Sequence, residues 1–261
     1  MPFALLILTL FFATPAWRAA LPGYHYQFPR DQFNHPDFRT EWWYYTGNLR
    51  ARNGHRYGFE LVFFRQGQRR GPSDNPSAWR VDDLYLAHLA LTDIDAVRFR
   101  YCKRLNRAGP GIAGASFDES RIWNGNWEVR WDQTSGTQTL AAVAEGVRFN
   151  LRLTPRKALV IHGENGVSQT AEGAGNAAHY ISFPRLAVEG TLNGAAVTGL
   201  AWMDHGWFSA CSIPRSGDGT GSACNSTRAP TSCCLSCAAA MARSIRTPPA
   251  PTSRPTAARR T

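Results

Sequence analysis

The sequence predicts an all-β protein, folded as an antiparallel sandwich or closed barrel. Apolar and polar residues alternate in short runs, most cleanly at residues 147–153. Asn53-Gly54 and Asn193-Gly194 each lie between two such runs, and Asn-Gly strongly favours a β-hairpin because both residues tolerate positive φ. No segment shows a convincing helical stripe of apolar residues, so we expect strands joined by turns throughout.

The most informative expected strand begins with Glu41, followed by Trp42, Trp43, Tyr44 and Tyr45. Neighbouring side chains of a strand point to opposite faces of its sheet. Trp42 and Tyr44 should therefore share one face, while Trp43 and Tyr45 share the other with Glu41. Such a strand either belongs to a core between two packed layers or lines an apolar pocket with an acid beside it.

The other strands are assigned in order from alternation and turn signals. We expect strands at residues 42–50, 57–65, 84–92, 99–105, 122–131, 137–144, 147–153, 158–162, 179–183, 186–192 and 196–203. Residues 122–131 are taken as one strand because Trp123, Trp127 and Trp131 would then share a face. The polar residues 25–39 form a lead-in arm and residues 66–78 a long loop. A closed barrel would leave no free edge and could enclose one ligand.

Length and charge limit the classes of protein. The 261 residues suffice for one large or two modest domains, and 43% hydrophobic residues can form a substantial core. Six Arg and one Asp after residue 215 contribute +5 of the net charge of +10, which leaves +5 for the rest. The sequence shows no recognisable nucleic-acid-binding module with a basic stripe, so nucleic acid is not an expected partner.

Residues 210–261 have a different composition from the rest of the chain. No aromatic residue follows Phe208, and five of the 6 cysteines fall in this segment. Its Ala, Ser, Thr, Pro and Arg residues follow no period, so we expect a disordered tail. Synonymous codons read in another frame restore β-like sequence, which suggests an out-of-frame origin. The late cysteines would then be neither metal ligands nor disulfide partners.

The N-terminus resembles an export signal. An apolar run at residues 3–13 is too short to span a bilayer, and Ala16, Ala19 and Ala20 offer cleavage points. We expect residues 1–20 to be a signal peptide and the mature protein, with no transmembrane span, to be periplasmic or in the cell envelope. The alternative is an apolar N-terminus on a cytoplasmic protein.

The chemistry that the sequence can support is limited to acids among aromatic residues. Neither a zinc-binding His motif, nor a Gly-rich phosphate loop, nor a nucleophile elbow is found. Asp204, His205 and Glu41 lie beside aromatic runs, and a carboxylic acid with a raised pKa can protonate an unactivated alkene. Aromatic faces stabilise the resulting cation by roughly 0.5–2 kcal/mol each. The alternative to a catalytic role is a structural one. Asp204-His205 would then form a strand-end turn with local hydrogen bonds, and Glu41 would form an ion pair with one of the many Arg residues.

The sequence resembles the carotenoid 1,2-hydratase (hydroxyneurosporene synthase) family, also described as AttH-like. The resemblance covers residues 24–209 and rests on ordered motifs: FPRDQFNHPDFRTEWWYYTGNL, DDLYLAHLALTDI, RLNRAGPGIAGA, WNGNW, HGENGVSQ, HYISFPRL and GLAWMDHGWFS. It implies a lipocalin-like (calycin-type) β fold, of which residues 24–209 are the first of two related domains. It also implies cofactor-independent hydration of acyclic carotenoids in some members, whereas others are exported proteins, some linked to ABC transporters.

The resemblance leaves two functions open. One is addition of water to a prenyl double bond of a lipophilic isoprenoid, with no cofactor or metal, Asp204 as acid, and His205 and Glu41 assisting. The other is non-catalytic binding of a lipophile together with ABC transporter components. In this family the motif usually reads W-M-D-H-E-W, whereas Gly206 replaces the acid here. The expected substrate-binding residues are Trp42, Trp43, Tyr44, Tyr45, His88, Trp202 and Trp207.

Overall fold

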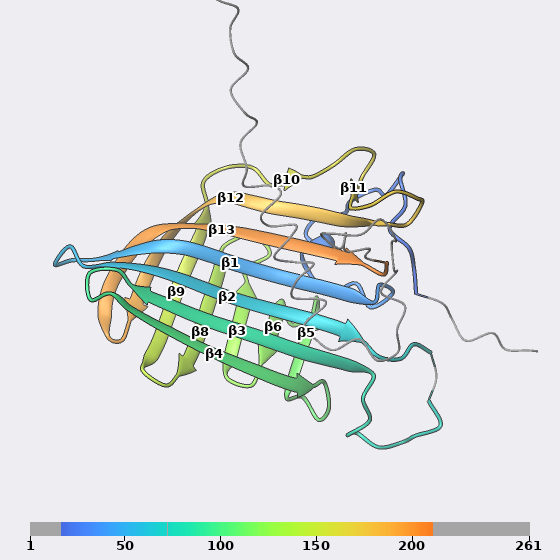
Figure 1. Cartoon of the computed structure of the whole chain (residues 1–261), viewed down its shortest axis with the longest axis horizontal. Coiled ribbons are helices and arrows are strands. Elements are labelled where there is room, and N and C mark those ends of the chain that lie inside the picture. The colour runs from blue at the N-terminus through green and yellow to red at the C-terminus, as the bar shows by residue number, and fades with distance from the viewer. Residues whose placement is uncertain (1–16, 72, 211–261) are drawn as a thin grey trace, which may run out of the picture. The chain divides into compact units, whose positions relative to one another are not determined.

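A computed structural model describes residues 17–71 and 73–210, which form an all-β, lipocalin-like unit with almost no helix (Figure 1). This confirms the predicted fold class. The described elements are η1 (Arg30–Gln32), β1 (Thr40–Ala51), β2 (Arg56–Gly67), β3 (Asp83–Asp93), β4 (Arg98–Arg107), β5 (Ala113–Ser116), β6 (Arg121–Asn124), β7 (Trp127–Trp131), β8 (Gln138–Ala144), β9 (Val147–Pro155), β10 (Val160–Ile161), β11 (Ser168–Gln169), β12 (Ala177–Leu192) and β13 (Ala195–Phe208). Most of the expected signal peptide and all but the first residue of the expected out-of-frame tail lie outside the described residues.

The described strands form a single antiparallel sheet that curls into a nearly closed barrel. The strand order is β4-β3-β2-β1-β13-β12-β9-β8-β7-β6-β5, and β10 and β11 also pair with β12. Figure 1 shows β5–β9 crossing behind β1–β4. Within the described ranges, no helix is long and apolar enough to cross a membrane.

The two edges of the sheet meet through side chains. Asn124 of β6 donates from Nδ2 to the Tyr85 carbonyl oxygen at 3.0 Å and accepts from Asn106 Nδ2 at 2.6 Å. Arg104 of β4 donates to the Asn124 carbonyl oxygen at 3.1 Å and lies 4.2 Å above the Trp127 ring. We call this junction the seam, and it closes the barrel where no strand-to-strand ladder does.

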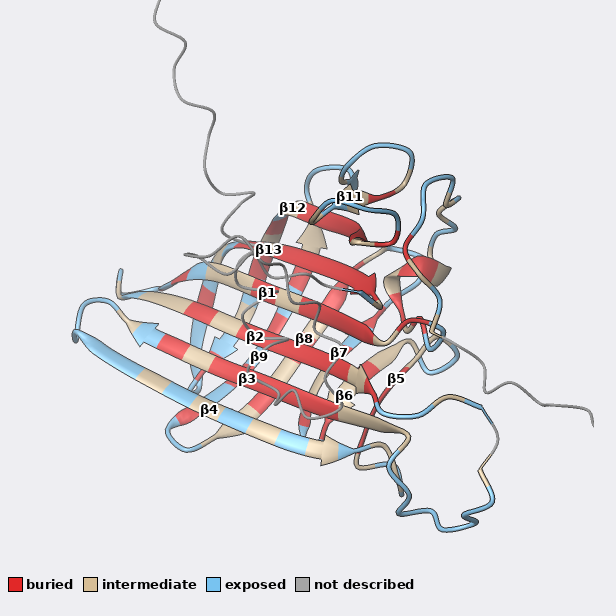
Figure 2. Cartoon of the chain, turned by 45° about the vertical axis from the view of Figure 1, so that its right-hand side comes forward, coloured by how far each residue is buried: buried red, intermediate tan, exposed pale blue. Residues whose placement is uncertain are grey.

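The interior of the barrel is the main apolar core. It contains inward-facing residues of almost every strand, as the buried segments in Figure 2 show. Trp43, Leu61, Leu89 and Leu151 are essentially inaccessible to solvent. By contrast, every other residue of β4 is exposed, in keeping with its position at the edge of the sheet. Alternation along each strand therefore separates a barrel interior from an outer face.

Residues before β1 pack against the end of this barrel. Phe33 belongs to the main core, whereas Ala20 and Phe38 join Ile181 and Trp207 in a second apolar cluster. The segment expected as a polar lead-in arm is therefore partly buried. Its apolar side chains cover the ends of β1, β12 and β13.

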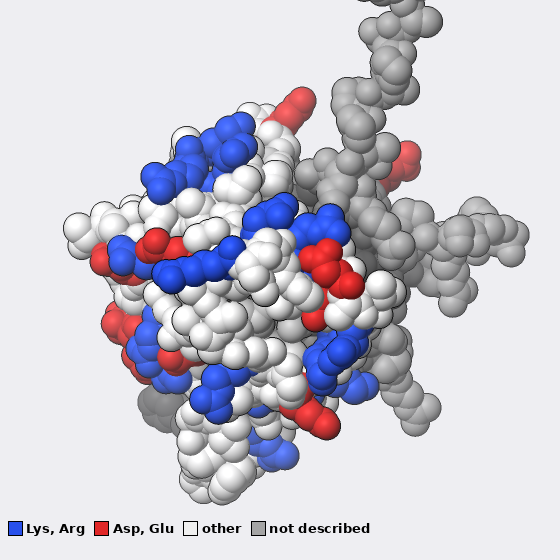
Figure 3. All heavy atoms as spheres, turned by 90° about the vertical axis from the view of Figure 1, so that its left-hand side faces the viewer, with Lys and Arg blue, Asp and Glu red and all other residues white. Residues whose placement is uncertain are grey.

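Both Asn-Gly dipeptides form hairpins, but the two turns differ. Asn193 and Gly194 both have positive φ, 50° and 85°, and directly join β12 to β13. In the β1–β2 hairpin only Gly54 has a positive φ, 88°, and Ala51 N–H donates to the His55 carbonyl oxygen at 2.9 Å. This is the three-residue loop in which glycine takes the last position. Figure 3 shows Arg and Lys in separate groups on this side of the molecule, several of them beside acids. At the start of β2, Arg56 forms an ion pair with Asp95 at 2.6 Å.

The single strand expected at residues 122–131 is wrong. The chain turns at Gly125, whose φ is +63°, and forms the β6–β7 hairpin with Asn124 opposite Trp127. Trp127 and Trp131 point into the core, whereas Trp123 lies on the other face and donates from Nε1 to the Gly111 carbonyl oxygen at 3.0 Å. The three indoles therefore do not share a face.

Candidate functional site

The central pair of strands, β1 and β13, places the expected site residues on two faces of the sheet. In the register, Glu41 lies opposite Trp207, Trp43 opposite His205, and Tyr44 opposite Asp204. The inward face carries Glu41, Trp43, Tyr45, His205 and Trp207. The outer face carries Trp42, Tyr44, Trp202 and Asp204. Asp204 and His205, neighbours in the sequence, are thus separated by the sheet.

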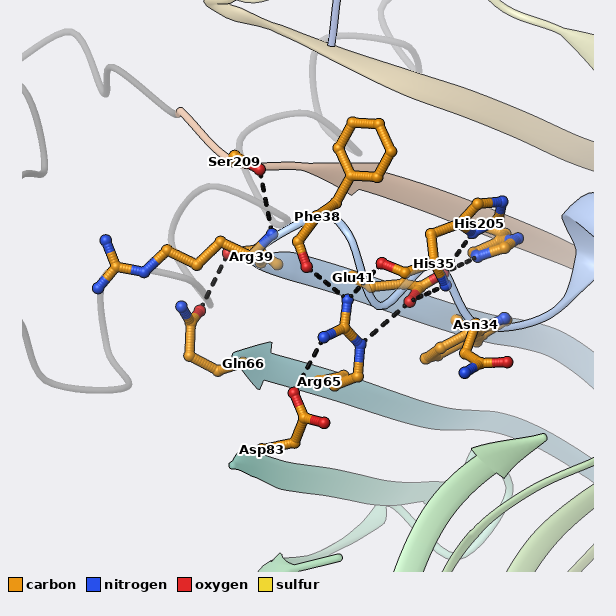
Figure 4. A network of polar contacts seen from close by, with 12 residues as sticks. Asn34, His35, Phe38, Arg39, Glu41, Arg65, Gln66, Asp83, His205 and Ser209 are labelled. Atoms are coloured by element: carbon orange, nitrogen blue, oxygen red, sulfur yellow. Dashed lines mark hydrogen bonds and ion pairs between the residues drawn. The ribbon is translucent and has the colours of Figure 1, made fainter. Parts of the chain in front are cut away.

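On the inward face, Glu41 is the centre of a buried polar network (Figure 4). His35 donates its backbone N–H to both carboxylate oxygens, at 3.1 and 2.9 Å, and its Nδ1–H to Oε1 at 2.7 Å. His205 donates from Nε2 to Oε1 at 2.9 Å. The second carboxylate oxygen accepts from Arg65 Nε at 3.2 Å. No part of Glu41 is accessible to solvent.

Arg65 ties this network to the arm before β1. Besides Glu41, its guanidinium donates to Asp83 at 3.0 Å and to the carbonyl oxygens of His35 and Phe38 at 2.8 and 2.6 Å. Its side chain is 1% exposed. A buried guanidinium with this many acceptors is a structural anchor that holds the arm on the barrel.

The network sets the charge of Glu41. Burial alone would raise the pKa of Glu41, but the charge of His35, hydrogen bonds from His205 and His35, and the charge of Arg65 hold it well below its usual range. Burial likewise opposes the charge of His35, but Glu41 and Asp31 outweigh it and raise the pKa of His35. Glu41 is therefore a permanent anion and cannot serve as a proton donor near neutral pH.

His205 behaves differently from His35. Burial lowers its pKa to about 4, despite the hydrogen bond to Glu41. Its ring stacks on Trp43 with centroids 4.9 Å apart, and its Nδ1 has no hydrogen-bond partner within residues 17–71 and 73–210. One possible metal-ligand atom from each of His35, Glu41 and His205 lies within 4.8 Å of the other two. Because the Arg65 guanidinium already neutralises Glu41 and His35 is drawn toward the cationic form, this cluster is an ion-pair network.

On the outer face, Asp204 lies among aromatic rings and neutral donors. Ser182 donates from Oγ, and Trp202 from Nε1, to Asp204 Oδ1, both at 2.5 Å. Tyr180 contributes a further hydrogen bond. Asp204 is 4% exposed, and its burial raises its pKa despite these donors. Among the described residues, no buried guanidinium contacts this carboxyl group, in contrast to Glu41.

The Trp42 ring covers Gly206 beside Asp204. A Cβ atom at Gly206 would lie 2.4 Å from Cη2 of the Trp42 ring. The same ring contacts Tyr180 and Phe208, with centroids 5.9 and 5.6 Å away. In the family that the sequence resembles, an acid usually occupies this position. Its side chain could not fit here unless the Trp42 indole moved.

The remaining expected residues divide between the two faces. Tyr44 donates to Glu60 at 2.9 Å on the outer face. His88 shares this face, in the cross-strand row that runs from Asp204 through Tyr44 and Val62. Tyr45 is buried in the core, where burial raises its pKa well above its usual value. Of the expected substrate-binding residues, Trp42, Tyr44, His88 and Trp202 share a face with Asp204, and Trp43, Tyr45 and Trp207 do not.

Sequence reasoning missed several residues of both clusters. They are Asp31, His35 and Arg65 inside, and Tyr180, Ser182 and His162 outside. The quoted motifs contain Asp31, His35, Tyr180, Ser182 and His162, but motif membership does not assign contacts. The signal needed was the strand register, because Arg65 lies opposite Glu41 and Ser182 opposite Asp204, and neither Asn-Gly dipeptide alone determines that register.

Comparison with known proteins identifies the family. The sequence model of the AttH-like family matches residues 19–217. The crystal structure of a protein assigned as AttH from Nitrosomonas europaea is 33% identical, with a TM-score of 0.66, over 74% of this chain. This chain spans 58% of that one. The crystal structure of kievitone hydratase from Nectria haematococca is 14% identical, with a TM-score of 0.51, over 77% of this chain and 58% of its own, and shows the shared fold.

The search of curated proteins found no match. The family match covers most of the chain, and the Nitrosomonas europaea protein exceeds 30% identity across nearly three quarters of it. The chain therefore belongs to the AttH-like family.

Proposed function

We propose that this protein is hydratase-like and adds water to a prenyl-type carbon–carbon double bond of a lipophilic isoprenoid, such as an acyclic carotenoid. One observation carries the proposal: Asp204 is a buried carboxyl group with a raised pKa, on a face lined by Trp42, Tyr180 and Trp202. The family and the hydratase that shares the fold agree with this chemistry. This chain spans 58% of the Nitrosomonas europaea protein. Any activity that needs the full length of such a protein is therefore proposed for this chain as well.

The proposed reaction needs one proton donor and one water molecule. Asp204 donates its proton to one alkene carbon, and the π electrons form the new C–H bond. The tertiary cation left on the other carbon lies against aromatic faces, each worth roughly 0.5–2 kcal/mol. Water then forms the C–O bond and releases a proton, so the net change is addition of H₂O and no cofactor is consumed.

In this proposal the three expected catalytic residues have different roles. Asp204 is the acid. Glu41 and His205 lie across the sheet from it and act as positioning residues, because they fix β1 and β13 through the inward network. Trp42, Tyr44, His88 and Trp202 are the proposed lining of the substrate site, while Trp43, Tyr45 and Trp207 support it from the core.

The test uses the full chain with lycopene and farnesol as probes in H₂¹⁸O. We expect a product heavier by one H₂¹⁸O, detected by mass spectrometry. Asp204→Asn should lower turnover by roughly 100-fold or more while quenching of Trp fluorescence still shows binding. Glu60→Gln, a matched change of an outer-face acid that contacts Tyr44, is the control for a general effect on that face. Unchanged turnover in Asp204→Asn would remove Asp204 as the acid.

A second function, binding without catalysis, is favoured by Gly206. The family acid is missing at this position, and the Trp42 ring occupies its space. In this alternative the protein is exported and presents a lipophile to ABC transporter components. Tight binding of farnesol with no ¹⁸O incorporation by the wild type, together with a cleaved leader and periplasmic location in cell fractionation, would support it over hydration.

A further inference from the structure

A line of three polar side chains connects the outer edge of the sheet to Asp204. His162 Nε2 lies 2.7 Å from Ser182 Oγ, and Ser182 Oγ lies 2.5 Å from Asp204 Oδ1. Ser182 is fully buried and Asp204 nearly so, whereas His162 is half-buried and reaches solvent. Of the three groups, only the imidazole can exchange protons with bulk water directly.

The fold places these groups in order. β10 pairs with the edge of β12 so that Val160 lies opposite Ser182, and His162 follows directly after β10. The backbone N–H of His162 donates to the Tyr180 carbonyl oxygen at 2.9 Å, and its ring lies 4.5 Å from the Tyr180 ring. Backbone and ring contacts therefore both fix the imidazole beside the serine hydroxyl.

We propose that His162 and Ser182 form a proton-delivery chain that restores the proton of Asp204 after each turnover. The inference rests on the proposed function and adds two residues to it. His162 in its cationic form donates its Nε2–H to Ser182 Oγ, while the Ser182 hydroxyl donates its own proton to the Asp204 carboxylate. The proton that water loses on attacking the carbon enters solvent, and His162 takes one up, so protons balance.

The order of the groups argues against a serine nucleophile. In a hydrolytic triad the carboxylate contacts the imidazole and orients it toward the hydroxyl. Here the carboxylate contacts the hydroxyl, and the histidine lies at the solvent end. This order suits passage of a proton inward.

The charges around the chain agree with this direction. Burial lowers the pKa of His162, an effect that the charge of Asp204 opposes, and burial raises the pKa of Asp204. The two pKa values are thus moved toward each other, which favours rapid transfer between them. Besides these two groups, the titratable side chain facing Asp204 is Tyr180, and Ser182 and Trp202 are uncharged.

The first test requires no turnover. In the full chain labelled with ¹⁵N-histidine, at a pH at which Asp204 is ionised and His162 is neutral, we expect His162 to carry its proton on Nε2. In this state the Ser182 hydroxyl donates to Asp204, so Nε2 must donate to Ser182 Oγ. Ser182→Ala should shift the ring toward the other tautomer, and Ser182→Thr, which keeps the hydroxyl, should not. An unchanged tautomer in Ser182→Ala would overturn the chain of hydrogen bonds.

The second test measures proton delivery with farnesol as the probe. His162→Gln should lower turnover roughly 100-fold. Added imidazole should then raise the turnover of this variant about tenfold or more. His55→Gln is the matched control, because His55 is also half-buried and bonded to a carboxylate, that of Asp93. A purely structural role for His162 would give no rescue by imidazole.

The outcomes separate the two proposals. If the wild type hydrates farnesol and His162→Gln does so at the same rate, the proton-delivery chain is wrong and the proposed function stands. If His162→Gln is slow and imidazole fails to rescue it, the chain is again wrong. If the wild type binds farnesol without adding water, both proposals fail together.

Discussion

Glu41 and Asp204 are both buried acids, yet their surroundings move their pKa values in opposite directions. Around Glu41, two imidazoles and a guanidinium outweigh the cost of burial and lower the pKa. Around Asp204, the neutral donors Ser182 and Trp202 do not outweigh burial, and the pKa rises. A sequence shows both as acids beside aromatic residues, so only the contacts assign one to ion pairing and the other to proton donation.

Replacing Glu41 by Gln should destabilise the fold strongly. The change removes the fully buried anion that Arg65 and His35 share and leaves each with only its second carboxylate, Asp83 or Asp31. Removing one partner of a buried pair costs about 3–5 kcal/mol. Urea unfolding followed by Trp fluorescence measures the loss. Glu189→Gln, an exposed position on β12, should stay within about 0.5 kcal/mol of the wild type. Equal effects of the two changes would contradict the anchoring role.

The contribution of His35 should depend on pH. Its pKa is raised above the usual 6.5 in the folded protein, so its stabilisation is complete below pH 6.5 and is lost as pH rises through the folded-state pKa. The difference in the free energy of unfolding between the wild type and His35→Gln should therefore shrink from pH 6 to pH 9. Denaturant unfolding at several pH values provides the measurement. A difference that grows with pH would show that His35 is neutral in the folded state.

At the scale of elements, turn chemistry predicted the hairpins but not every register. Alternation correctly placed Trp42 and Tyr44 on one face of the sheet and Trp43 and Tyr45 on the other. Counting back from Asn193-Gly194, however, puts Phe183 opposite Asp204. A bulge between Phe183 and Leu186 shifts β12 by one residue and brings Ser182 there instead. A bulge depends on contacts across the sheet, so this part of the site was hidden from the sequence.

The wrong assignment of residues 122–131 has a similar cause. Tryptophans four residues apart fit one face of a strand, and the pattern outweighed Gly125 and its neighbouring Asn residues. Gly125 with φ of +63° instead reverses the chain. Likewise, an expected two-residue turn at Asn53-Gly54 would place Gln66 opposite Glu41, whereas the observed three-residue loop places Arg65 there. The inward ion network therefore depends on a turn type that the dipeptide alone does not determine.

The β12–β13 turn offers a clean measurement of backbone strain. A Cβ at Gly194 would meet nothing within 4 Å, but the residue has φ of +85°. Gly194→Ala should therefore cost about 1–2 kcal/mol through backbone conformation alone. Gly58→Ala, within β2 and with its nearest neighbour 3.8 Å from the added Cβ, should be neutral or slightly stabilising. Thermal unfolding of both variants decides, and equal melting temperatures would contradict the turn assignment.

At the scale of the whole described unit, the seam determines how the barrel is closed. The backbone ladder continues from β4 around to β5, but the return from β6 to β3 and β4 uses the side chains of Asn124, Asn106 and Arg104. A few side-chain bonds are easier to break than a strand ladder. Local opening should therefore begin there.

Removing the Asn124 side chain should weaken the seam. Asn124→Ala leaves the Tyr85 carbonyl oxygen and the Asn106 amide without their partners, at about 1–3 kcal/mol. Amide hydrogen exchange should become faster in β5, β6 and β4 than in β1 and β13. Asn150→Ala, at an exposed position of β9, should leave the exchange pattern unchanged. Uniform acceleration in every strand would mean that the barrel opens only as a whole.

The two faces of the β1–β13 pair also bear on how the family can diversify. Residues that hold the barrel together point inward, and the proposed ligand contacts Trp42, Tyr44 and Trp202 point outward from the same strands. Alternation makes each face a separate target for selection. A library randomised at the half-buried Tyr44 and Trp202, with the buried Trp42 kept, should retain expression and folding while its ligand preference drifts. New specificities could then evolve on this sheet without compensating changes in its interior.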